Sequence, residues 1–334
     1  MKKYIGLDAH SSTCTFCVMN EKGVELDNTT IRTNGRLLVN YLKSIKGNTT
    51  LTFEECELSS WLYEILVKEV DDVLVCNPVY NKEYKTRKTD RLDARKLAKL
   101  LRGDFLTPVF HDGSNREKFR DLMSAYTDLV EEATRIKLRY KSLFRKSGNK
   151  VVGEKLYTDE SFIKDLKRKD YNFIGKSLYH LLQEMEENRQ KYKKEIIKAS
   201  KKFKEIRKFK TLPGIGDIRA AHISAQVINP RRFASKYQYY SYCGLVRHKQ
   251  ISGDREYGSR KIWGNRVLKC VYKMAAHDAI RGDNKLSKYY ESLRKKGVND
   301  KGARNAVSRK IAAISLSMWK NNSDYDESKI IIAI

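Results

Sequence analysis

Near its start the chain reads YIGLD at residues 4–8, a short apolar run that ends on the carboxylate of Asp8. The arrangement returns further along, where the run at 51–53 ends on Glu54. Short apolar runs bounded by polar residues are typical of buried β-strands. If these two strands are neighbours in one sheet, both carboxylates belong to the same region of the fold. Residues 1–110 therefore indicate an α/β domain with acids on its central sheet.

A third acidic stretch reads TDRLDAR at residues 89–95 and opens a helical pattern. Thr89 is a suitable N-cap, and Asp90 and Asp93 stand three residues apart, so they share one face of a helix. The predicted order of elements over 1–110 is β-β-β-α-β-α-β-α. We expect strands at 4–9, 13–19, 24–33, 50–54 and 73–75, and helices at 35–45, 61–70 and 91–101.

The charge of the chain indicates a polyanionic partner. Its 334 residues include 68 lysines and arginines against 41 acids, which gives a formal net charge of +27. Counterion release from phosphates favours binding of such a chain to nucleic acid. A hydrophobic fraction of 40% identifies a folded protein and excludes a purely basic tail. The alternative is a basic protein with no nucleic-acid partner.

Four acids inside so basic a chain, Asp8, Glu54, Asp90 and Asp93, would repel a phosphate unless divalent cations lay between them. Transfer at a phosphodiester commonly uses such cations, and Mg²⁺ prefers hard oxygen ligands. A single Asp in such a run is usually a cap or a surface charge, but the order and placement of all four favour a Mg²⁺ centre on a ribonuclease-H-like sheet. Glu55 and Glu57 compete for the second position, and we prefer Glu54 because it directly follows the strand.

Residues 115–146 carry apolar side chains at alternating spacings of three and four, which predicts a long helix with one continuous seam. A second stripe includes Leu178, Leu181 and Met185 and continues to Ile206, with a basic outer face from Arg189 to Lys210. Two helices packed within one chain and a coiled coil between subunits explain these stripes equally well. The basic face favours a nucleic-acid contact over a merely solvated surface. The first seam comprises Phe119, Leu122, Tyr126, Leu129, Ala133, Ile136, Tyr140 and Leu143.

Residues 211–280 contain two features that suggest phosphate chemistry. The run LPGIG at 212–216 resembles a helix-hairpin-helix turn, in which glycines let backbone N–H groups approach a phosphate. Ser252 stands in a basic, glycine-containing loop, ISGDR at 251–255. A serine there could attack a phosphorus whose charge nearby cations neutralise, although a serine beside a glycine is usually a turn residue. The nearby cationic or titratable side chains are Arg247, His248, Lys249 and Arg255.

Targeting signals and cysteines indicate the compartment. Met1 to Lys3 lead directly into a strand-like run, and no apolar run approaches the ~20 residues of a membrane span. Cys14 and Cys17 fall in a predicted strand, so they should point to opposite faces and not form a zinc or redox pair. We expect a cytoplasmic, nucleoid-associated protein with no membrane partner.

These motifs together resemble the insertion-sequence-110 family of transposases, also called DEDD transposases. The N-terminal part of the resemblance rests on IGLD at 5–8, FE at 53–54, CNP at 76–78 and KTDRLDAR at 88–95. The C-terminal part rests on LPGIG at 212–216, RF at 232–233, YCGL at 242–245, SG at 252–253 and GN at 264–265. The resemblance implies a RuvC-like DEDD catalytic domain at 1–110, a coiled-coil helical region at 111–210 and a mostly helical serine transposase domain at 211–334.

The resemblance also implies the chemistry and the partners. In the family the DEDD acids bind Mg²⁺, and here those positions are Asp8, Glu54, Asp90 and Asp93. A serine, here Ser252, forms a covalent link to DNA. Members are guided by a structured RNA, the bridge RNA, which pairs with donor and target DNA. They assemble as tetramers of two dimers, with sites shared between subunits.

The sequence therefore predicts an RNA-guided DNA recombinase that moves an insertion sequence, with attack by Ser252 assisted by Mg²⁺ on the four acids. One alternative is a RuvC-like structure-specific nuclease with no covalent step. Another is a nucleic-acid-binding protein with a degenerate site, which the four intact acids argue against.

Overall fold

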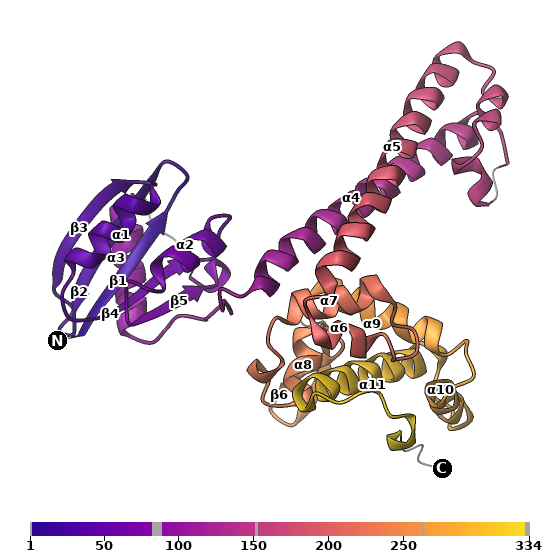
Figure 1. Cartoon of the computed structure of the whole chain (residues 1–334). Coiled ribbons are helices and arrows are strands. Elements are labelled where there is room, and N and C mark those ends of the chain that lie inside the picture. The colour runs from indigo at the N-terminus through magenta and orange to yellow at the C-terminus, as the bar shows by residue number, and fades with distance from the viewer. Residues whose placement is uncertain (1, 82–88, 151–152, 262–263, 331–334) are drawn as a thin grey trace. The chain divides into compact units, whose positions relative to one another are not determined.

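The computed structural model describes residues 2–81, 89–150, 153–261 and 264–330 (Figure 1). The chain folds into two compact units, Met1–Glu117 and Lys118–Ile334. The first is built on a five-stranded mixed sheet in the order β3-β2-β1-β4-β5. Its elements are β1 (Lys2–Ala9), β2 (Thr13–Asn20), β3 (Glu25–Arg32), α1 (Gly35–Ser44), β4 (Asn48–Glu54), α2 (Ser59–Leu66), β5 (Asp72–Cys76), the short helix η1 (Pro78–Tyr80) and α3 (Asp90–Arg102).

The order of these elements confirms the pattern predicted for this part of the chain. The central strand β1 pairs antiparallel with β2 and parallel with β4, so the first and fourth strands are indeed neighbours. In that parallel pair Leu7 lies opposite Phe53, and the next residues along the two strands are Asp8 and Glu54. The two acids therefore occupy equivalent positions on adjacent strands.

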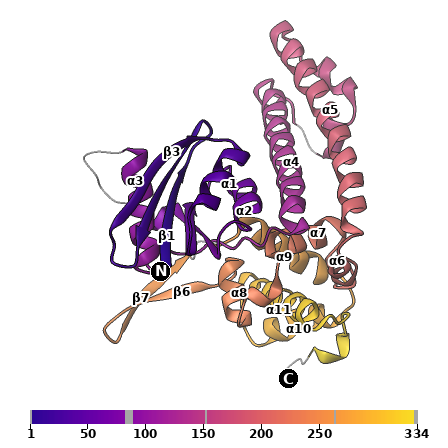
Figure 2. The same ribbon diagram turned by 60° about the vertical axis from the view of Figure 1, so that its left-hand side comes forward.

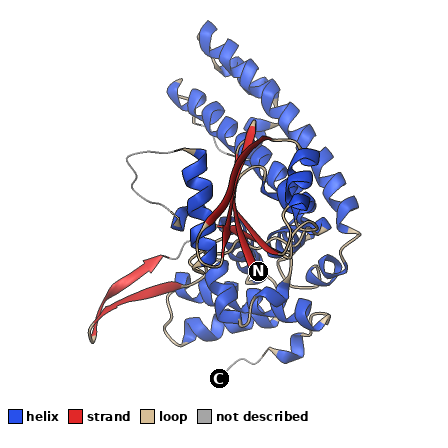
Figure 3. Cartoon of the chain, turned by 90° about the vertical axis from the view of Figure 1, so that its left-hand side faces the viewer, coloured by secondary structure: helices blue, strands red, loops and turns tan. Residues whose placement is uncertain are grey.

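Side-chain alternation along β1 assigns its residues to the two layers of helices. Ile5 and Leu7 are fully buried in the core that α1 and α2 form with the sheet. Gly6 and Asp8 consequently point to the other face, which α3 covers (Figures 2 and 3).

The neighbouring strands follow the same alternation. On β4, Leu51 and Phe53 pack in the core with α1 and α2, so Glu54 lies on the α3 face with Asp8. On β2, Cys14 belongs to that same core, whereas Cys17 packs in a separate cluster with residues of α3. The two cysteines point to opposite faces, as their spacing predicts.

Helix α3 lies directly on β1 because residue 6 has no side chain. A Cβ at Gly6 would come within 2.1 Å of the carbonyl oxygen of Ala94 and 2.5 Å of the backbone nitrogen of Ala98. Both alanines are fully buried. This close approach brings the first turn of α3, with Asp90 and Asp93, beside the end of β1.

Replacing Gly6 with Ala is expected to destabilise the first unit by about 1–3 kcal/mol, the usual range for overpacking a well-packed core. The added methyl group meets backbone atoms, so the helix itself must move. Thermal unfolding of Gly6→Ala and of Gly35→Ala would measure the effect, because a Cβ at Gly35 lies 3.4 Å from the Trp61 side chain, within ordinary contact distance. Equal melting temperatures for the two variants would contradict the close approach.

The second unit contains a long helical arm (Figure 1). Its two helices are α4 (Asn115–Lys146) and α5 (Lys169–Ser200), which are joined through the short helices η2 (Glu154–Tyr157) and η3 (Glu160–Asp165). The predicted seam is confirmed as a packing surface: its aromatic and aliphatic side chains are buried in clusters that include residues of α5. Buried members are Phe119, Tyr126, Ala133, Ile136, Tyr140 and Leu143.

The second stripe differs from the prediction at one position. Leu181 is 40% exposed, whereas Tyr179 and Leu182 are buried. The prediction that Leu181 follows Leu178 in the stripe is therefore wrong. The side chain that faces α4 is Leu182, four residues after Leu178, and it packs with Ala133 and Ile136. The packing within one chain is therefore present in the structure.

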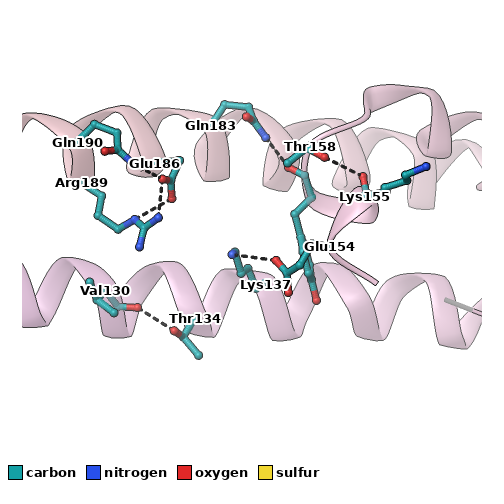
Figure 4. Close-up of polar contacts among 11 residues, drawn as sticks. Val130, Thr134, Lys137, Glu154, Lys155, Thr158, Gln183, Glu186, Arg189 and Gln190 are labelled. Carbon is teal, nitrogen blue, oxygen red and sulfur yellow. Dashed lines mark hydrogen bonds and ion pairs between the residues drawn. The ribbon is translucent and has the colours of Figure 1, made fainter. Parts of the chain in front are cut away.

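Polar contacts connect the arm to its linking segment (Figure 4). Lys137 Nζ lies 3.6 Å from Glu154 Oε2, and Gln183 donates from Nε2 to the Tyr157 carbonyl oxygen at 2.8 Å. These contacts tie η2 to both helices of the arm.

The remainder of the second unit is a bundle of helices with one β-hairpin. Gly214, in the turn between α6 (Lys204–Phe209) and α7 (Asp217–Val227), has φ of +80°. A Cβ there would lie 2.2 Å from the carbonyl oxygen of Ala275 on α9 (Arg266–Ala279). No helix among the described residues is long and apolar enough to cross a bilayer. The elements are α6 (Lys204–Phe209), α7 (Asp217–Val227), η4 (Pro230–Arg232), α8 (Lys236–Tyr242), β6 (Arg247–Ser252), β7 (Arg255–Lys261), α9 (Arg266–Ala279), α10 (Lys285–Lys295), α11 (Asp300–Asn321) and η5 (Glu327–Lys329).

Candidate metal centre and nucleic-acid interface

The end of β1 and the start of α3 bring three of the predicted residues together. Thr89 caps α3 by accepting a hydrogen bond from the Leu92 backbone N–H at 3.3 Å, as predicted. The cap begins the helix at Asp90, and Asp93 follows in the same turn. Both carboxylates act electrostatically on Asp8, whose side chain is 20% exposed. The structure therefore places Asp8, Asp90 and Asp93 in one acidic cluster.

Burial is the largest influence on Asp8 and raises the pKa of its carboxyl group. The neighbouring His10 opposes this shift, and Asp90 and Asp93 add to it because like charges disfavour ionisation. A carboxylate that is mostly buried and close to other carboxylates costs folding free energy unless a cation compensates it. This arrangement is typical of functional sites.

His10 is a further member of this cluster and lies outside the predicted set of four acids. Its Nε2 lies 3.3 Å from Asp8 Oδ2 and 4.0 Å from Asp90 Oδ1. Ligand atoms of Asp8, His10 and Asp90 all lie within 4.8 Å of one another. The sequence pattern that indicates His10 is the spacing Asp-x-His at the end of a buried strand, because residues two apart on a strand share a face.

Glu54 lies on the same face of the sheet as Asp8, one strand away, and is not part of that closest cluster. Its Oε1 accepts a hydrogen bond from Asn81 Nδ2 at 3.1 Å. Asn81 is 6% exposed and also donates to Cys76 Sγ at 3.2 Å, and its carbonyl oxygen accepts from Lys96 of α3. Asn81 thus orients Glu54, a role that no local sequence pattern indicates.

Glu55, the competitor of Glu54, is engaged elsewhere. Its Oε2 lies 2.7 Å from Nε2 of His111, whose side chain is fully buried, and Glu117 Oε1 lies 3.3 Å from Nδ1 of the same ring. Burial alone would lower the pKa of His111, but the two carboxylates outweigh it and raise that pKa to about 9. The resulting imidazolium stabilises the fold below the ordinary histidine pKa, and this contribution is lost as the pH rises through about 9.

Because His111 engages Glu55, Glu54 is the glutamate at this strand end that remains on the Asp8 face. Glu57, the other competitor, is exposed beyond the end of β4.

The cluster fits a divalent cation by the chemistry of its donors. Carboxylate oxygens are hard ligands of the kind that Mg²⁺ and Mn²⁺ take, and an imidazole nitrogen is a further donor that suits Mn²⁺. A cation there would also compensate the burial and the like-charge repulsion that together raise the pKa of Asp8. Asp8 and Asp90 are the carboxylates best placed to hold it, with His10 beside them.

Ser252 lies in the second unit, at the last position of β6. It faces Arg255, the first residue of β7, across a two-residue turn in which Gly253 has φ of +56°. The stretch expected to be a loop is thus the tip of a β-hairpin, and Ser252 is exposed there. A two-residue Gly-Asp turn is a favoured hairpin signal.

The glycine turn at 212–216 connects α6 to α7 within the bundle. Gly216 is the N-cap of α7 and has no capping side chain, and a Cβ on it would meet open space. Lys210 and Asp217 form an ion pair across the turn, with Nζ and Oδ1 2.5 Å apart. The turn does join two helices, and its helix-hairpin-helix character stays a prediction.

The first unit carries an acidic cluster on a mixed sheet, and the second unit is basic and helical. These two features define the class of protein: one with a candidate metal centre and a candidate nucleic-acid interface. Residues 5–149 match the family model described as transposase, DEDD type, and residues 206–291 match that of the transposase IS116/IS110/IS902 family. The chain belongs to the IS110 family of transposases.

A curated relative supports the same assignment. The protein named "Putative transposase y4qE" from Sinorhizobium fredii (strain NBRC 101917 / NGR234) is 28% identical over 190 residues, which cover 56% of this chain and 47% of the relative. The chain thus spans about half the length of the curated relative it matches.

Proposed function

We propose that this protein is the DNA transposase of an insertion sequence, which cuts and rejoins DNA strands through a covalent serine–DNA intermediate. The observation that carries the proposal is the convergence of Asp8 and Asp90, with Asp93 and His10, in a chain of the IS110 family. The proposal includes a RuvC-like fold for the first unit, to which the mixed sheet with acids at the ends of β1 and β4 lends support.

In the proposed reaction Ser252 Oγ attacks a DNA phosphorus. The bond from that phosphorus to one sugar oxygen breaks as the bond to serine forms. The serine proton passes to solvent, and the departing sugar oxygen takes up a proton. Attack by a sugar hydroxyl of another strand then reverses the step and releases the serine, so that strands are exchanged with the number of phosphodiester bonds unchanged.

The residues of the two units have separate roles in this reaction. Arg255 pairs with Ser252 across the hairpin, and in the proposal it neutralises the phosphate under attack. Asp8 and Asp90, with Glu54 and Asp93, would hold a divalent cation, most simply Mg²⁺. Such a cation would supply charge stabilisation to the phosphoryl group in transfer. Asn81 orients Glu54 through a hydrogen bond, and His111 engages Glu55 through an ion pair.

Two further parts of the proposal rest on family membership. We propose that a structured guide RNA selects donor and target DNA, and that the active form is a homo-oligomer, with dimers pairing into tetramers. The basic face of the arm and bundle from Arg189 to Lys210 supports a nucleic-acid contact by charge alone. The exposed side chains Leu138 and Phe173 of the arm are compatible with pairing between subunits.

The test is a strand-transfer assay with purified protein, its guide RNA and DNA that carries the element ends. We expect cleaved and rejoined products with Mg²⁺ or Mn²⁺ and none with a chelator, together with a protein–DNA adduct that survives denaturation. Products formed at full rate in chelator would contradict the metal centre. Cleavage with no adduct and no rejoining would favour the alternative, a RuvC-like nuclease.

A further inference from the structure

The β6–β7 hairpin is a ribbon with no layer packed on it among the described residues. Every described side chain from Arg247 to Arg260 is exposed, and Figures 2 and 3 show the two strands extending away from the helices of their own unit. A two-stranded hairpin is marginally stable in water without a surface to bury against. Its exposed residues include two large apolar side chains, Ile251 (63%) and Tyr257 (69%). The ribbon therefore has the properties of a segment that gains its packing from a partner.

The register of the strands separates the ribbon into two faces. Ser252 pairs with Arg255, and further along the same face His248 pairs with Arg260. The opposite face carries Lys249 and Glu256, which form an ion pair of 2.8 Å between Nζ and Oε2. Because Glu256 lies on that opposite face, the face of Ser252 presents two arginines and a histidine and no carboxylate from either described strand.

The strands are interrupted by a bulge near the tip. The register shifts between Gln250 and Ile251, so that Tyr257 is the extra residue on β7, and Gly258 after it has φ of +137°. Bulges of this kind redirect one side chain away from the regular alternation and are frequent beside active sites. The bulge residue is thus an exposed aromatic one, two positions along β7 from Arg255, the partner of Ser252.

We propose that this hairpin is a DNA-reading ribbon: it enters the major groove of duplex DNA beside the phosphate that Ser252 attacks, with Arg255 and Arg260 on the groove walls and Tyr257 against the bases. The B-DNA major groove admits a two-stranded β-ribbon. The major groove of A-form RNA is too narrow and deep for side chains to read, which favours DNA over an RNA duplex as the occupant. The inference rests on the proposed function in that it takes DNA as the substrate.

The charge of the ribbon agrees with this partner. Between Arg247 and Lys261 the sequence has five lysines and arginines, at 247, 249, 255, 260 and 261, against two acids, at 254 and 256. Each cation that neutralises a phosphate adds about 0.9 to the slope of log Kd against log salt. The proposal thus predicts a measurable contribution from the two arginines on the Ser252 face.

The experiment measures binding of a short DNA duplex by the full chain at several salt concentrations. For Arg255→Gln/Arg260→Gln we expect weaker binding and a salt slope lower by about 1.8, which is twice the contribution of one phosphate contact. The matched control is Lys164→Gln/Lys167→Gln, which removes the same charge from exposed positions near the tip of the arm. Tyr257→Ala should weaken DNA binding roughly 10-fold without changing the slope, as expected for loss of an apolar contact to bases.

An unchanged slope in the double arginine variant, or an equal loss in the control, would overturn the inference. A duplex RNA of the same length serves as a second probe, and an equal loss of RNA binding in the ribbon variants would overturn the assignment to the DNA groove. Binding is measured in chelator, without cleavage. Native DNA binding by the ribbon variants, in a protein that performs metal-dependent strand transfer, would therefore overturn the inference alone. Weaker DNA binding by the ribbon variants, in a protein that performs no strand transfer, would count against the proposed function alone.

Discussion

Replacing Asp8 with Asn is expected to reduce metal-dependent strand transfer at least roughly 100-fold, because a bound cation contributes several kcal/mol to such a reaction and each 1.4 kcal/mol is a factor of ten. The substituted asparagine keeps the size of the side chain but removes the charge that a cation needs. The assay compares initial rates of product formation at saturating Mg²⁺. The control is Asp104→Asn in the same unit, at an exposed position whose φ of +57° asparagine also tolerates.

In the absence of metal, Asp8→Asn is expected to raise thermal stability, although the same substitution lowers activity. Burial and the nearby Asp90 and Asp93 make the ionised Asp8 unfavourable, so Asp8→Asn should unfold at a higher temperature than the native chain in chelator. With Mn²⁺ added, the native chain should gain stability and the variant should not. A variant that is less stable in chelator and still cleaves DNA at the native rate would contradict the role assigned to Asp8.

Replacing Ser252 with Ala is expected to abolish both the covalent adduct and the exchange of strands. The hydroxyl is the proposed nucleophile, and an alanine at this exposed strand position leaves no side-chain oxygen in its place. Binding of duplex DNA should change little, since Arg255 and Arg260 remain. The matched control is Ser259→Ala, also exposed, on the other strand and the opposite face of the same hairpin.

The two readouts separate the competing interpretations. An adduct that persists in Ser252→Ala would place the nucleophile elsewhere. If Ser252→Ala cleaves DNA at the native rate and neither it nor the native chain forms an adduct, the result would support the alternative of a RuvC-like nuclease without a covalent step. Loss of adduct in both Ser252→Ala and Ser259→Ala would indicate that the hairpin is needed for its shape alone.

Much of the first unit could be predicted from the sequence because its signals are local. Apolar runs end at Asp8 and Glu54, and the Thr89 cap starts α3 where the sequence indicates. The proximity of Asp8 to Asp90 depends on a longer-range effect, the absence of a side chain at Gly6, which allows α3 to lie on the sheet. A glycine in a strand signals close approach, but not which helix approaches.

The supporting residues of the centre could not be predicted, because their partners are distant in the sequence. Asn81 reaches Glu54 from a segment 27 residues away, and His111 reaches Glu55 across 56 residues. No periodicity connects such pairs. His10 is the exception, since it stands two residues after Asp8 at the same strand end.

The hairpin escapes prediction as a strand pair for a different reason. Ile251 and Tyr257 are isolated among polar residues, so the regular alternation of apolar and polar residues that reveals a half-buried strand is absent. The sequence signals the turn at Gly253, but without apolar alternation it indicates only a loop around Ser252. The same lack of a buried face is what makes the ribbon a candidate for insertion into DNA.

The most direct test of the metal centre is the position of a cation in a crystal of the protein with Mn²⁺. An anomalous difference map collected near the manganese edge should contain a peak within about 2.0–2.3 Å of carboxylate oxygens of both Asp8 and Asp90, at the distances that such ions adopt. The peak should be absent from crystals of Asp8→Asn grown in the same solution. Saturating Mn²⁺ with no peak between β1 and α3 of the native protein, or a peak unchanged in Asp8→Asn, would contradict the account.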